Sequence, residues 1–186
     1  TITFVVSPPP VVLNCPVNTI TSACQTQTAV DAAFANWLST ASASGGCNGV
    51  LTNSNTGAPA ACGGSTTVTF TYTSSCAPLT TTCQATFSVA AAPAVVISCP
   101  ANTNVVGLSQ MDVNAAFATW LMTASASGGC NGMFTNSNIG APLASGGSTT
   151  VTFTYTSSCA PTTTTCQATF SVQAGFILNM ETNTYY

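Results

Sequence analysis

Residues 63–78 read GGSTTVTFTYTSSCAP, and the same letters recur without change at residues 146–161. In the first copy, Val68, Phe70 and Tyr72 alternate with threonines. The side chains of a β-strand point alternately to its two faces, so this pattern predicts a half-buried strand with a threonine-covered outer face. Aromatic and β-branched residues also favour a strand over a helix.

A second strand is expected a few residues further along the chain. Ala85, Phe87 and Val89 alternate with polar residues in the same way. The intervening residues 74–82 contain Ser, Pro and Thr, which are typical of the connection in a hairpin. Together the two segments predict a β-hairpin.

The recurrence extends over most of the chain at a constant offset of 83 residues. Two further stretches repeat: residues 40–49 recur at 123–132, and residues 80–89 recur at 163–172. Self-similarity at a fixed period indicates tandem structural units. We expect two repeat domains, at residues 8–90 and 91–173, connected by short and fairly stiff linkers rich in Pro and Ala.

The two ends of the chain continue this pattern. Phe4 lies 83 residues before Phe87, so residues 1–7 match the last strand of a repeat whose body is absent. The C-terminal tail, residues 174–186, includes an apolar run that resembles the opening strand of a repeat: Phe176, Ile177 and Leu178. We therefore expect a spare strand at each end of two whole repeats.

One segment of each repeat has the period of a helix. Val30, Phe34, Trp37 and Leu38 are spaced i, i+4, i+7, i+8, which predicts an amphipathic helix over about residues 29–40. Its expected start is a capping-box-like pair, Thr28 and Asp31, and the second helix is expected at about 112–123 after Ser109 and Asp112. We interpret Trp37 and Trp120 as core residues of these helices rather than as platforms for sugars.

The composition excludes most chemistry. The chain has no Lys, Arg or His, and its acidic side chains are Asp31, Asp112 and Glu181. It therefore lacks a histidine or lysine for general-base or Schiff-base catalysis, and the scattered carboxylates do not predict a metal site. Without cations it cannot bind the nucleic-acid backbone. We expect no cofactor, no metal and no catalytic residue, and no apolar run is long enough for a membrane helix.

Ten cysteines indicate disulfides formed in an oxidising, extracellular setting. Comparison of the repeats identifies one pair. Only Cys24 and Cys62 lack a counterpart in the second repeat, where residues 106–108 and Ser145 take their places. When a disulfide is lost from one repeat, both of its cysteines are expected to be lost together, because a single remaining thiol would be reactive. We therefore expect Cys24 to be bonded to Cys62. The other four cysteines of each repeat allow three pairings, and a local Cys76–Cys83 bridge across the hairpin is one of them.

Short motifs at both ends of each repeat resemble the hyalin-repeat (HYR) family. These motifs are the opening CP-x-N, at residues 15–18 and 99–102, and the ending TTVTFTYT…C…C-x-x-x-F-x-V, at residues 66–89 and 149–172. Similar Thr-rich cysteine repeats with an inserted VDAAFxxWL helix occur in very large surface proteins of Bacteroidota-type bacteria. The inserted helix departs from the family pattern.

This resemblance implies a mainly β fold of two tandem immunoglobulin-like β-sandwich domains, each with one short inserted helix and held by disulfides. It also implies that the cysteine before Pro joins the cysteine of the last strand, which gives Cys15–Cys83 and Cys99–Cys166. The remaining pairs are then Cys47–Cys76 and Cys130–Cys159.

We therefore expect a structural subunit or segment of an extracellular or cell-surface filament or stalk. Its partners would be other copies of the same chain, joined head-to-tail by β-strand addition. The expected anchors are Ile2, Phe4 and Val6 in the N-terminal strand, with Phe176, Ile177 and Leu178 of the tail in the same joint.

Three other functions were weighed. An adhesin-type module could recognise a carbohydrate or a cell surface through the Asn- and Ser-rich loops at 48–55 and 131–138. The threonine row Thr67–Thr73 resembles an ice-binding face, but one such strand per repeat offers little flat surface. An enzyme is the least expected class. The density of Ser and Thr permits O-linked glycan, whereas no N-x-S/T sequon is present.

Overall fold

The computed structural model describes residue 2 and residues 7–175. The described residues form a mainly β structure with two helices, and the chain divides into two compact units, Thr1–Pro93 and Ala94–Tyr186. The division lies three residues after the boundary expected between residues 90 and 91. The reason is that the backbone N–H groups of Ala90 and Ala92 donate to carbonyl oxygens of the first unit, at 2.9 and 3.0 Å.

The first unit is built on a four-stranded sheet in the order β2-β6-β5-β4. Its strands are β2 (Thr19–Thr21), β4 (Val50–Asn53), β5 (Gly64–Thr73) and β6 (Thr80–Val89). Strands β5 and β6 form the expected hairpin and pair along their whole length, while β2 lies parallel to β6. Strands β2 and β4 are therefore the two edges of the sheet.

The alternation in the hairpin produces one buried and one exposed face, as predicted. Val68, Phe70 and Phe87 have exposed fractions of only 0, 1 and 2%. The threonines between them point to the opposite face, where Thr67 and Thr86 share a hydrogen bond at 2.9 Å between their hydroxyls. Burial of the apolar row against the rest of the unit supplies the main driving force for folding.

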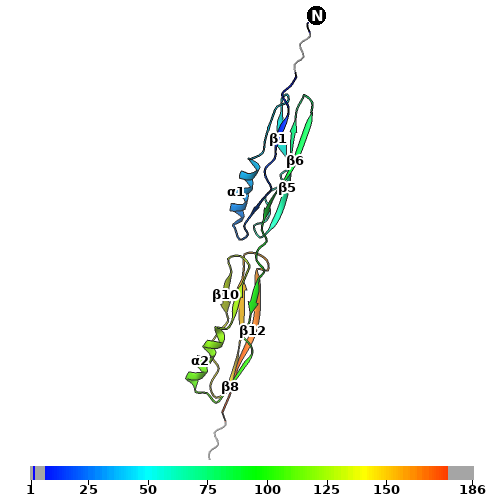
Figure 1. Ribbon diagram of the computed structural model, residues 1–186. Helices are drawn as coiled ribbons and strands as arrows, with labels where there is room; N and C mark the ends of the chain where they lie inside the picture. The colour runs from blue at the N-terminus through cyan, green and yellow to red at the C-terminus, as the bar shows by residue number, and fades with distance from the viewer. Residues whose placement is uncertain (1, 3–6, 176–186) are drawn as a thin grey trace, which may run out of the picture. The chain divides into compact units, whose positions relative to one another are not determined.

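A helix and a two-stranded ladder cover the apolar face of this sheet (Figure 1). The ladder pairs β1 (Val12–Asn14) with β3 (Ser42–Ser44), and the helix is α1 (Gln27–Leu38). Phe34 lies edge-on to Phe87, with ring centroids 5.4 Å apart, and Trp37 lies edge-on to Phe70 at 6.1 Å. Trp37 is 7% exposed, which confirms its expected place in the core.

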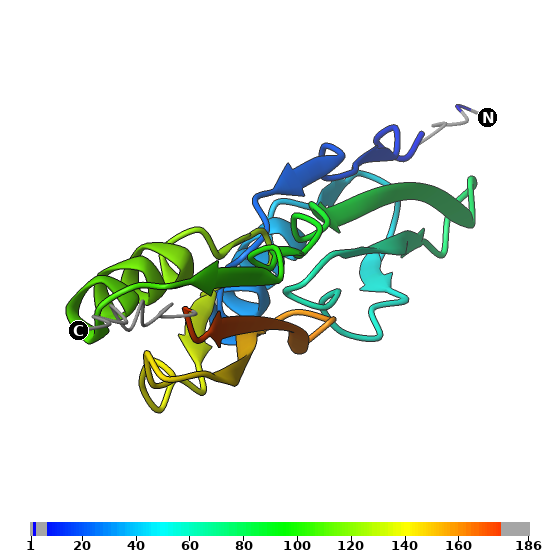
Figure 2. The same ribbon diagram turned by 90° about the horizontal axis from the view of Figure 1, so that it is seen from below.

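The second unit repeats this arrangement. Its four-stranded sheet has the order β10-β11-β12-β8, and a ladder of β7 with β9 accompanies helix α2 (Figure 2). The bounds are β7 Val96–Ser98, β8 Thr103–Val106, α2 Gln110–Leu121, β9 Ser125–Ser127, β10 Met133–Asn136, β11 Gly147–Thr156 and β12 Thr163–Gln173. Phe117 and Trp120 pack on Phe170, with ring centroids 5.3 and 5.5 Å away.

The start of the first helix differs from the prediction. The N-cap is Thr26, whose hydroxyl accepts a hydrogen bond from the N–H of Ala29 at 3.2 Å, so the expected cap at Thr28 is wrong. In the second unit Ser109 is the cap, and its hydroxyl both accepts from the N–H of Asp112 and donates to that carboxylate. Both helices therefore begin two residues earlier than expected, at Gln27 and Gln110.

Candidate functional site: bonded loops and open strand edges

Disulfides connect the two layers of each unit. Cys15, just after β1, is bonded to Cys83 in β6 with a Cα–Cα distance of 6.1 Å, and Cys99 is bonded to Cys166 with 6.0 Å. These are the pairs implied by the hyalin-repeat resemblance. Because Cys83 is bonded to Cys15, the alternative Cys76–Cys83 bridge does not form.

A third disulfide joins Cys47 to Cys76, with a Cα–Cα distance of 5.3 Å. The remaining four cysteines are disulfide-bonded as well: Cys24, Cys62, Cys130 and Cys159. None of the ten cysteines is therefore free. The pairings Cys24–Cys62 and Cys130–Cys159 stay predictions. Disulfides throughout both units indicate that the protein matures in an oxidising environment.

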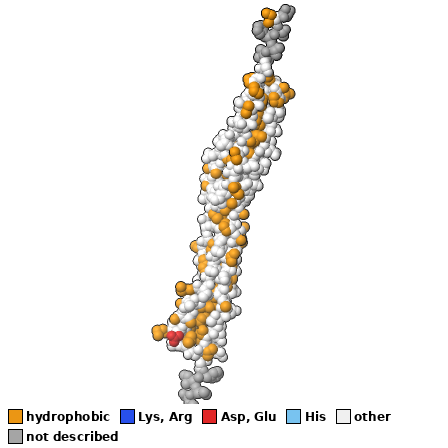
Figure 3. Space-filling view, in the orientation of Figure 1, with side chains coloured by type: hydrophobic (Ala, Val, Ile, Leu, Met, Phe, Trp, Pro, Cys, Tyr) orange, Lys and Arg blue, Asp and Glu red, His pale blue; other side chains and the backbone are white. Residues whose placement is uncertain are grey.

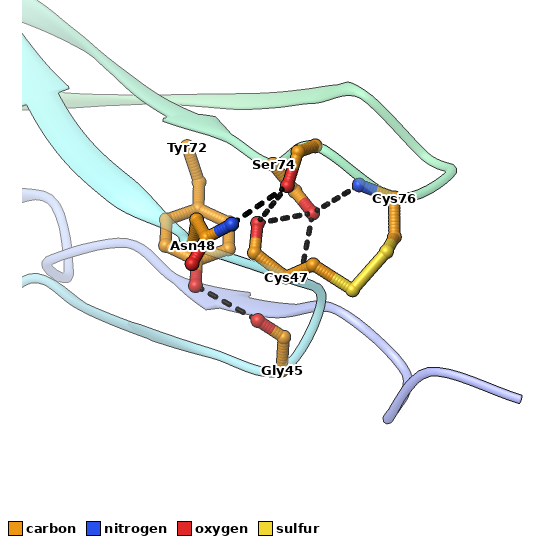
Figure 4. Close-up of a disulfide and its surroundings, with 7 residues drawn as sticks. Gly45, Cys47, Asn48, Tyr72, Ser74 and Cys76 are labelled. Carbon is orange, nitrogen blue, oxygen red and sulfur yellow. Dashed lines mark hydrogen bonds between the residues drawn. A yellow bond between two sulfur atoms is a disulfide. The ribbon is translucent and has the colours of Figure 1, made fainter. Parts of the chain in front are cut away.

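A buried serine organises the loop around the Cys47–Cys76 bond (Figure 4). Ser74 is a buried residue with an exposed fraction of 9%. Its hydroxyl accepts hydrogen bonds from the N–H groups of Cys47 and Cys76, at 2.9 and 3.1 Å, and donates one to the Cys47 carbonyl at 3.2 Å. Ser157 makes the same contacts in the second unit. The loop of the first unit is thus fixed by hydrogen bonds as well as by the Cys47–Cys76 disulfide, and the equivalent loop of the second unit has the same hydrogen bonds.

A tyrosine holds the other side of the same loop. The Tyr72 hydroxyl donates to the Gly45 carbonyl at 2.9 Å, and Tyr155 does so to Gly128 at 2.8 Å. The Tyr72 ring also lies directly over Gly49, where any Cβ atom would collide with it. An added Cβ atom would also collide at Gly45 and Gly46, so close packing favours glycine at all three glycine positions of GGCNG.

The CP-x-N motif lies just before β2 and makes hydrogen bonds to the sheet and to the helix. The Asn18 side-chain oxygen accepts from the backbone N–H of Thr86 in β6 at 2.8 Å. The carbonyl of Val17 accepts from the indole N–H of Trp37, also at 2.8 Å. The motif therefore connects the disulfide, the sheet and the helix of one unit.

A glutamine fastens the first turn of each helix to a distant loop. The Gln27 side chain donates to the carbonyl of Pro59 at 3.1 Å and accepts from the N–H of Ala61 at 3.0 Å. Gln110 makes the equivalent pair with Pro142 and Ala144. We call this pair of hydrogen bonds the glutamine clamp. Its recurrence at the same place in both repeats was the only signal in the sequence that could have identified it.

The outer strands β4 and β10 are open on one side among the described residues. β4 pairs with β5 only, and β10 with β11 only, and every residue of both strands is exposed. Neither strand contains a charged residue or a proline, which are the features that commonly protect edges from pairing with other chains. The opposite edges of the two sheets, β2 and β8, also lack charge and proline but include partly buried residues, so we take the fully exposed β4 and β10 as the candidate assembly sites.

The predicted assembly residues lie mostly outside the described part of the chain. Ile2 is described and is 84% exposed. The others fall outside the described residues: Phe4, Val6, Phe176, Ile177 and Leu178.

The Asn-rich loops use their amide oxygens internally. Asn53 accepts from the N–H of Asn55 at 3.1 Å, and Asn55 accepts from the N–H of Gly57 at 2.8 Å. Asn136 and Asn138 form the same turns in the second unit. These Asx turns stabilise the loops and leave those oxygens engaged.

Titratable groups are sparse in the described residues. Asp31 accepts a hydrogen bond from Gln27 at 2.8 Å, and Asp112 interacts with Ser109 at the start of α2. No group of three or more His, Cys, Asp or Glu residues that could hold a metal occurs within the described part of the chain. None of the helices described has the length and apolar character needed to cross a membrane.

No family model matches the chain, and no curated protein matches it. A solved structure described as "I-band fragment I67-I69 from titin" is similar over 91% of this chain and 66% of that chain, at 8% sequence identity and a TM-score of 0.29. The chain thus spans slightly less than two thirds of the length of that fragment. A TM-score of this size is too low to establish a shared fold.

Proposed function

We propose that this chain is a structural subunit or segment of an extracellular filament or stalk, assembled head-to-tail by β-strand addition. The observation that carries the proposal is the pair of open, uncharged edge strands, β4 and β10, on units whose cysteines are all disulfide-bonded. An open edge presents unpaired backbone groups to another chain, and a strand from a neighbouring copy can pair with them.

The surface supports self-association. Charged residues make up 2% of the chain, and on the face drawn in Figure 3 hydrophobic atoms are scattered among uncharged polar ones, with little acidic surface. A low net charge gives little electrostatic repulsion between copies. Head-to-tail contacts between identical copies are heterologous, and they propagate as a filament when the rotation does not close a ring.

We infer that each unit is a variant of the immunoglobulin-like sandwich related to hyalin repeats. Two features support this inference. The cysteine of the CP motif, Cys15, is bonded to Cys83 in the last strand, and the asparagine of the motif, Asn18, accepts a hydrogen bond from Thr86 in the same strand. Helix α1 and the β1–β3 ladder form the second layer of the first unit, where a sandwich would have a second sheet. The resemblance also supports our proposal that the protein acts outside the cell or at its surface, where exposed Ser and Thr side chains would be available for O-linked glycan.

The alternative is an adhesin-type module that binds a carbohydrate or a cell surface. No observation specifically favours it, because amide oxygens of Asn53 and Asn55 in its expected loop are engaged in turns. A glycan-array screen of the isolated chain tests this alternative directly.

The proposed function is tested by assembly of the oxidised full-length chain at micromolar concentration, followed by sedimentation and negative-stain electron microscopy. Filaments are expected from the wild-type chain. A Phe4→Asp variant is expected to lose them, because the charge cannot be buried in a strand joint. Leu79→Asp is the control, since Leu79 is 62% exposed in the β5–β6 connection and lies outside both terminal segments.

Two outcomes contradict this proposal. A wild-type chain that stays monomeric under all assembly conditions argues against a filament. Equal assembly of the Phe4→Asp and wild-type chains argues that residues 1–7 are not the added strand.

A further inference from the structure

The two edge strands β4 and β10 differ in one respect that folding does not explain. The buried positions of the two units are occupied by the same residue types, for example Val30 and Val113, or Phe70 and Phe153. Differences between the units therefore fall mainly on exposed positions. Three of them lie on or just after the edge strand: Val50 to Met133 and Leu51 to Phe134 enlarge an apolar side chain, and Thr56 to Ile139 replaces a hydroxyl-bearing side chain by an apolar one.

These side chains are accessible. Met133 is 60% exposed, Phe134 is 37% exposed and Ile139 is 94% exposed. The residues between them are unchanged, since residues 52–55 and 135–138 both read TNSN. The Asx turns and the contacts of this loop with the neighbouring strand are also the same in both units. The second unit has therefore kept the geometry of this edge while making it more apolar.

The backbone of β10 is arranged to accept a strand. The N–H of Ser137 donates to the carbonyl of Thr152 in β11 at 3.0 Å, so Ser137 faces its own sheet. Backbone groups of successive residues in a strand point to opposite sides of the ladder. The N–H and C=O groups of Asn136 and Phe134 consequently point outward, two residues apart, which is the spacing that an added strand requires.

We propose that the acceptor edge for strand addition is the outer side of β10, and that its occupant is the segment of residues 1–6 of a second copy of this chain. This inference rests on the proposed function. The sheet has a hydroxyl face, which includes Thr135, and an apolar face, on which Phe134 stacks on Phe153 with ring centroids 6.1 Å apart.

The sequence of the segment matches these two faces. Thr1, Thr3 and Val5 alternate with Ile2, Phe4 and Val6, so one face carries two threonines and a valine and the other three apolar side chains. With the period of two of a strand, the threonines extend the hydroxyl face while the three apolar side chains extend the face of Phe134. A shift of one residue would place the apolar set on the hydroxyl face, so the pairing is restricted to registers that differ by an even number of residues.

The test follows amide hydrogen exchange in the full-length, isotope-labelled chain before and after association. Association is expected to protect the amides of Phe134 and Asn136, and not those of Leu51 and Asn53. Protection on β4, β2 or β8 instead, or no protection at Phe134 and Asn136, overturns the choice of edge. If filaments still form in that case, the proposed function stands and only the acceptor is wrong.

A matched pair of variants gives an independent measurement. Asn136→Pro removes an N–H that points away from β11, and proline is tolerated at such positions of an edge strand. We expect it to weaken association by about tenfold, the effect of losing one intermolecular hydrogen bond. Asn53→Pro makes the same change in the identical TNSN segment of the first unit and is expected to leave association unchanged. Association of Asn136→Pro at the wild-type level overturns the inference, and circular dichroism verifies that both variants are folded.

A peptide of sequence TITFVV decides the case in which the intact chain does not associate. The peptide is added to the labelled full-length chain, and shifts of the Phe134 and Asn136 amide signals are expected. No shift at either amide overturns both this inference and the strand-addition mechanism. Shifts at β10 without filaments support this acceptor edge and contradict the filament alone.

Discussion

The side chain of Asn18 pairs with the backbone N–H of Thr86, 68 residues away in sequence, at 2.8 Å. The parallel ladder of β2 with β6 begins one residue later, where Thr19 lies opposite Phe87. The short strand β2 does not reach the N–H of Thr86, which lies just before its ladder with β6, and the asparagine side chain supplies the acceptor for this N–H. Asn102 and Thr169 form the same pair in the second unit.

Replacing this asparagine gives the first prediction. Asn18→Ala removes the acceptor of one exposed hydrogen bond, so we expect it to lower the free energy of unfolding by about 1 kcal/mol. For a unit of this size, that corresponds to a decrease of about 5 °C in the midpoint of thermal unfolding. Asn18→Asp keeps an acceptor oxygen at the same place and serves as the control. A decrease of equal size in both variants would show that the hydrogen bond is not the cause.

Ser74 gives a second prediction with a larger effect. Ser74→Ala leaves the N–H groups of Cys47 and Cys76 without their acceptor in a partly buried loop. Leaving buried donors unpaired costs about 1–3 kcal/mol, which urea unfolding can measure. Ser75→Ala is the matched control, because Ser75 is an exposed neighbour that donates to the Cys47 carbonyl at 3.0 Å. Equal losses in the two variants would contradict the special role of Ser74.

The hairpin and the buried face of the helix could be predicted because local periodicity determines them. Val68 and Phe70 lie two residues apart and face the core, and Phe34 and Trp37 occupy one stripe of α1. Three disulfides could also be predicted, because the family resemblance implied the pairings Cys15–Cys83, Cys47–Cys76 and Cys99–Cys166. These features depend on residues that are near in sequence or repeated in it.

The remaining features depend on contacts between distant residues. Thr26 and Thr28 could each cap the N-terminus of α1. The structure uses Thr26, and the residue after it, Gln27, donates a hydrogen bond to the carbonyl of the distant Pro59. The parallel strand β2 contains only three residues, TIT, too few to show a period. Asn18 carries no local sign that it accepts from Thr86. Patterns within one segment contain no information about these partners.

The two tryptophans provide a third prediction about the independence of the units. Each unit has its own core, with Trp37 in one and Trp120 in the other. Trp37→Phe removes the donor to the Val17 carbonyl and part of the core volume, so we expect a loss of about 1–3 kcal/mol in the first unit only. The fluorescence of Trp120 then follows the second unit, whose unfolding curve should match that of the wild type. Trp120→Phe is the reciprocal control, and a common shift of both transitions would show that the units unfold together.

Cys24 and Cys62 give the last prediction. All ten cysteines are bonded, so thiol labelling of the unfolded, unreduced chain should give no signal, and a peptide map should join Cys24 to Cys62. The map needs pepsin or a similar protease, because the chain contains no Lys or Arg for trypsin. Cys24 has a backbone φ of 65°, and Gly107, at the corresponding place in the second unit, has 68°. The loop therefore keeps its backbone conformation in a unit that has no such cysteine.

The same comparison predicts that the pair is not essential for folding. The Cys24→Ser, Cys62→Ser double variant should keep the fold and lose about 3–4 kcal/mol, the chain-entropy value for a loop of this length. The glutamine clamp of Gln27 on Pro59 and Ala61 then still holds the loop to the helix, as Gln110 does in the second unit. Gln27→Ala should consequently cost more in the double variant than in the wild type, a non-additivity that a double-mutant cycle measures. Additive losses would show that the two contacts act on separate parts of the unit, and Cys24 bonded to any other cysteine would refute the pairing.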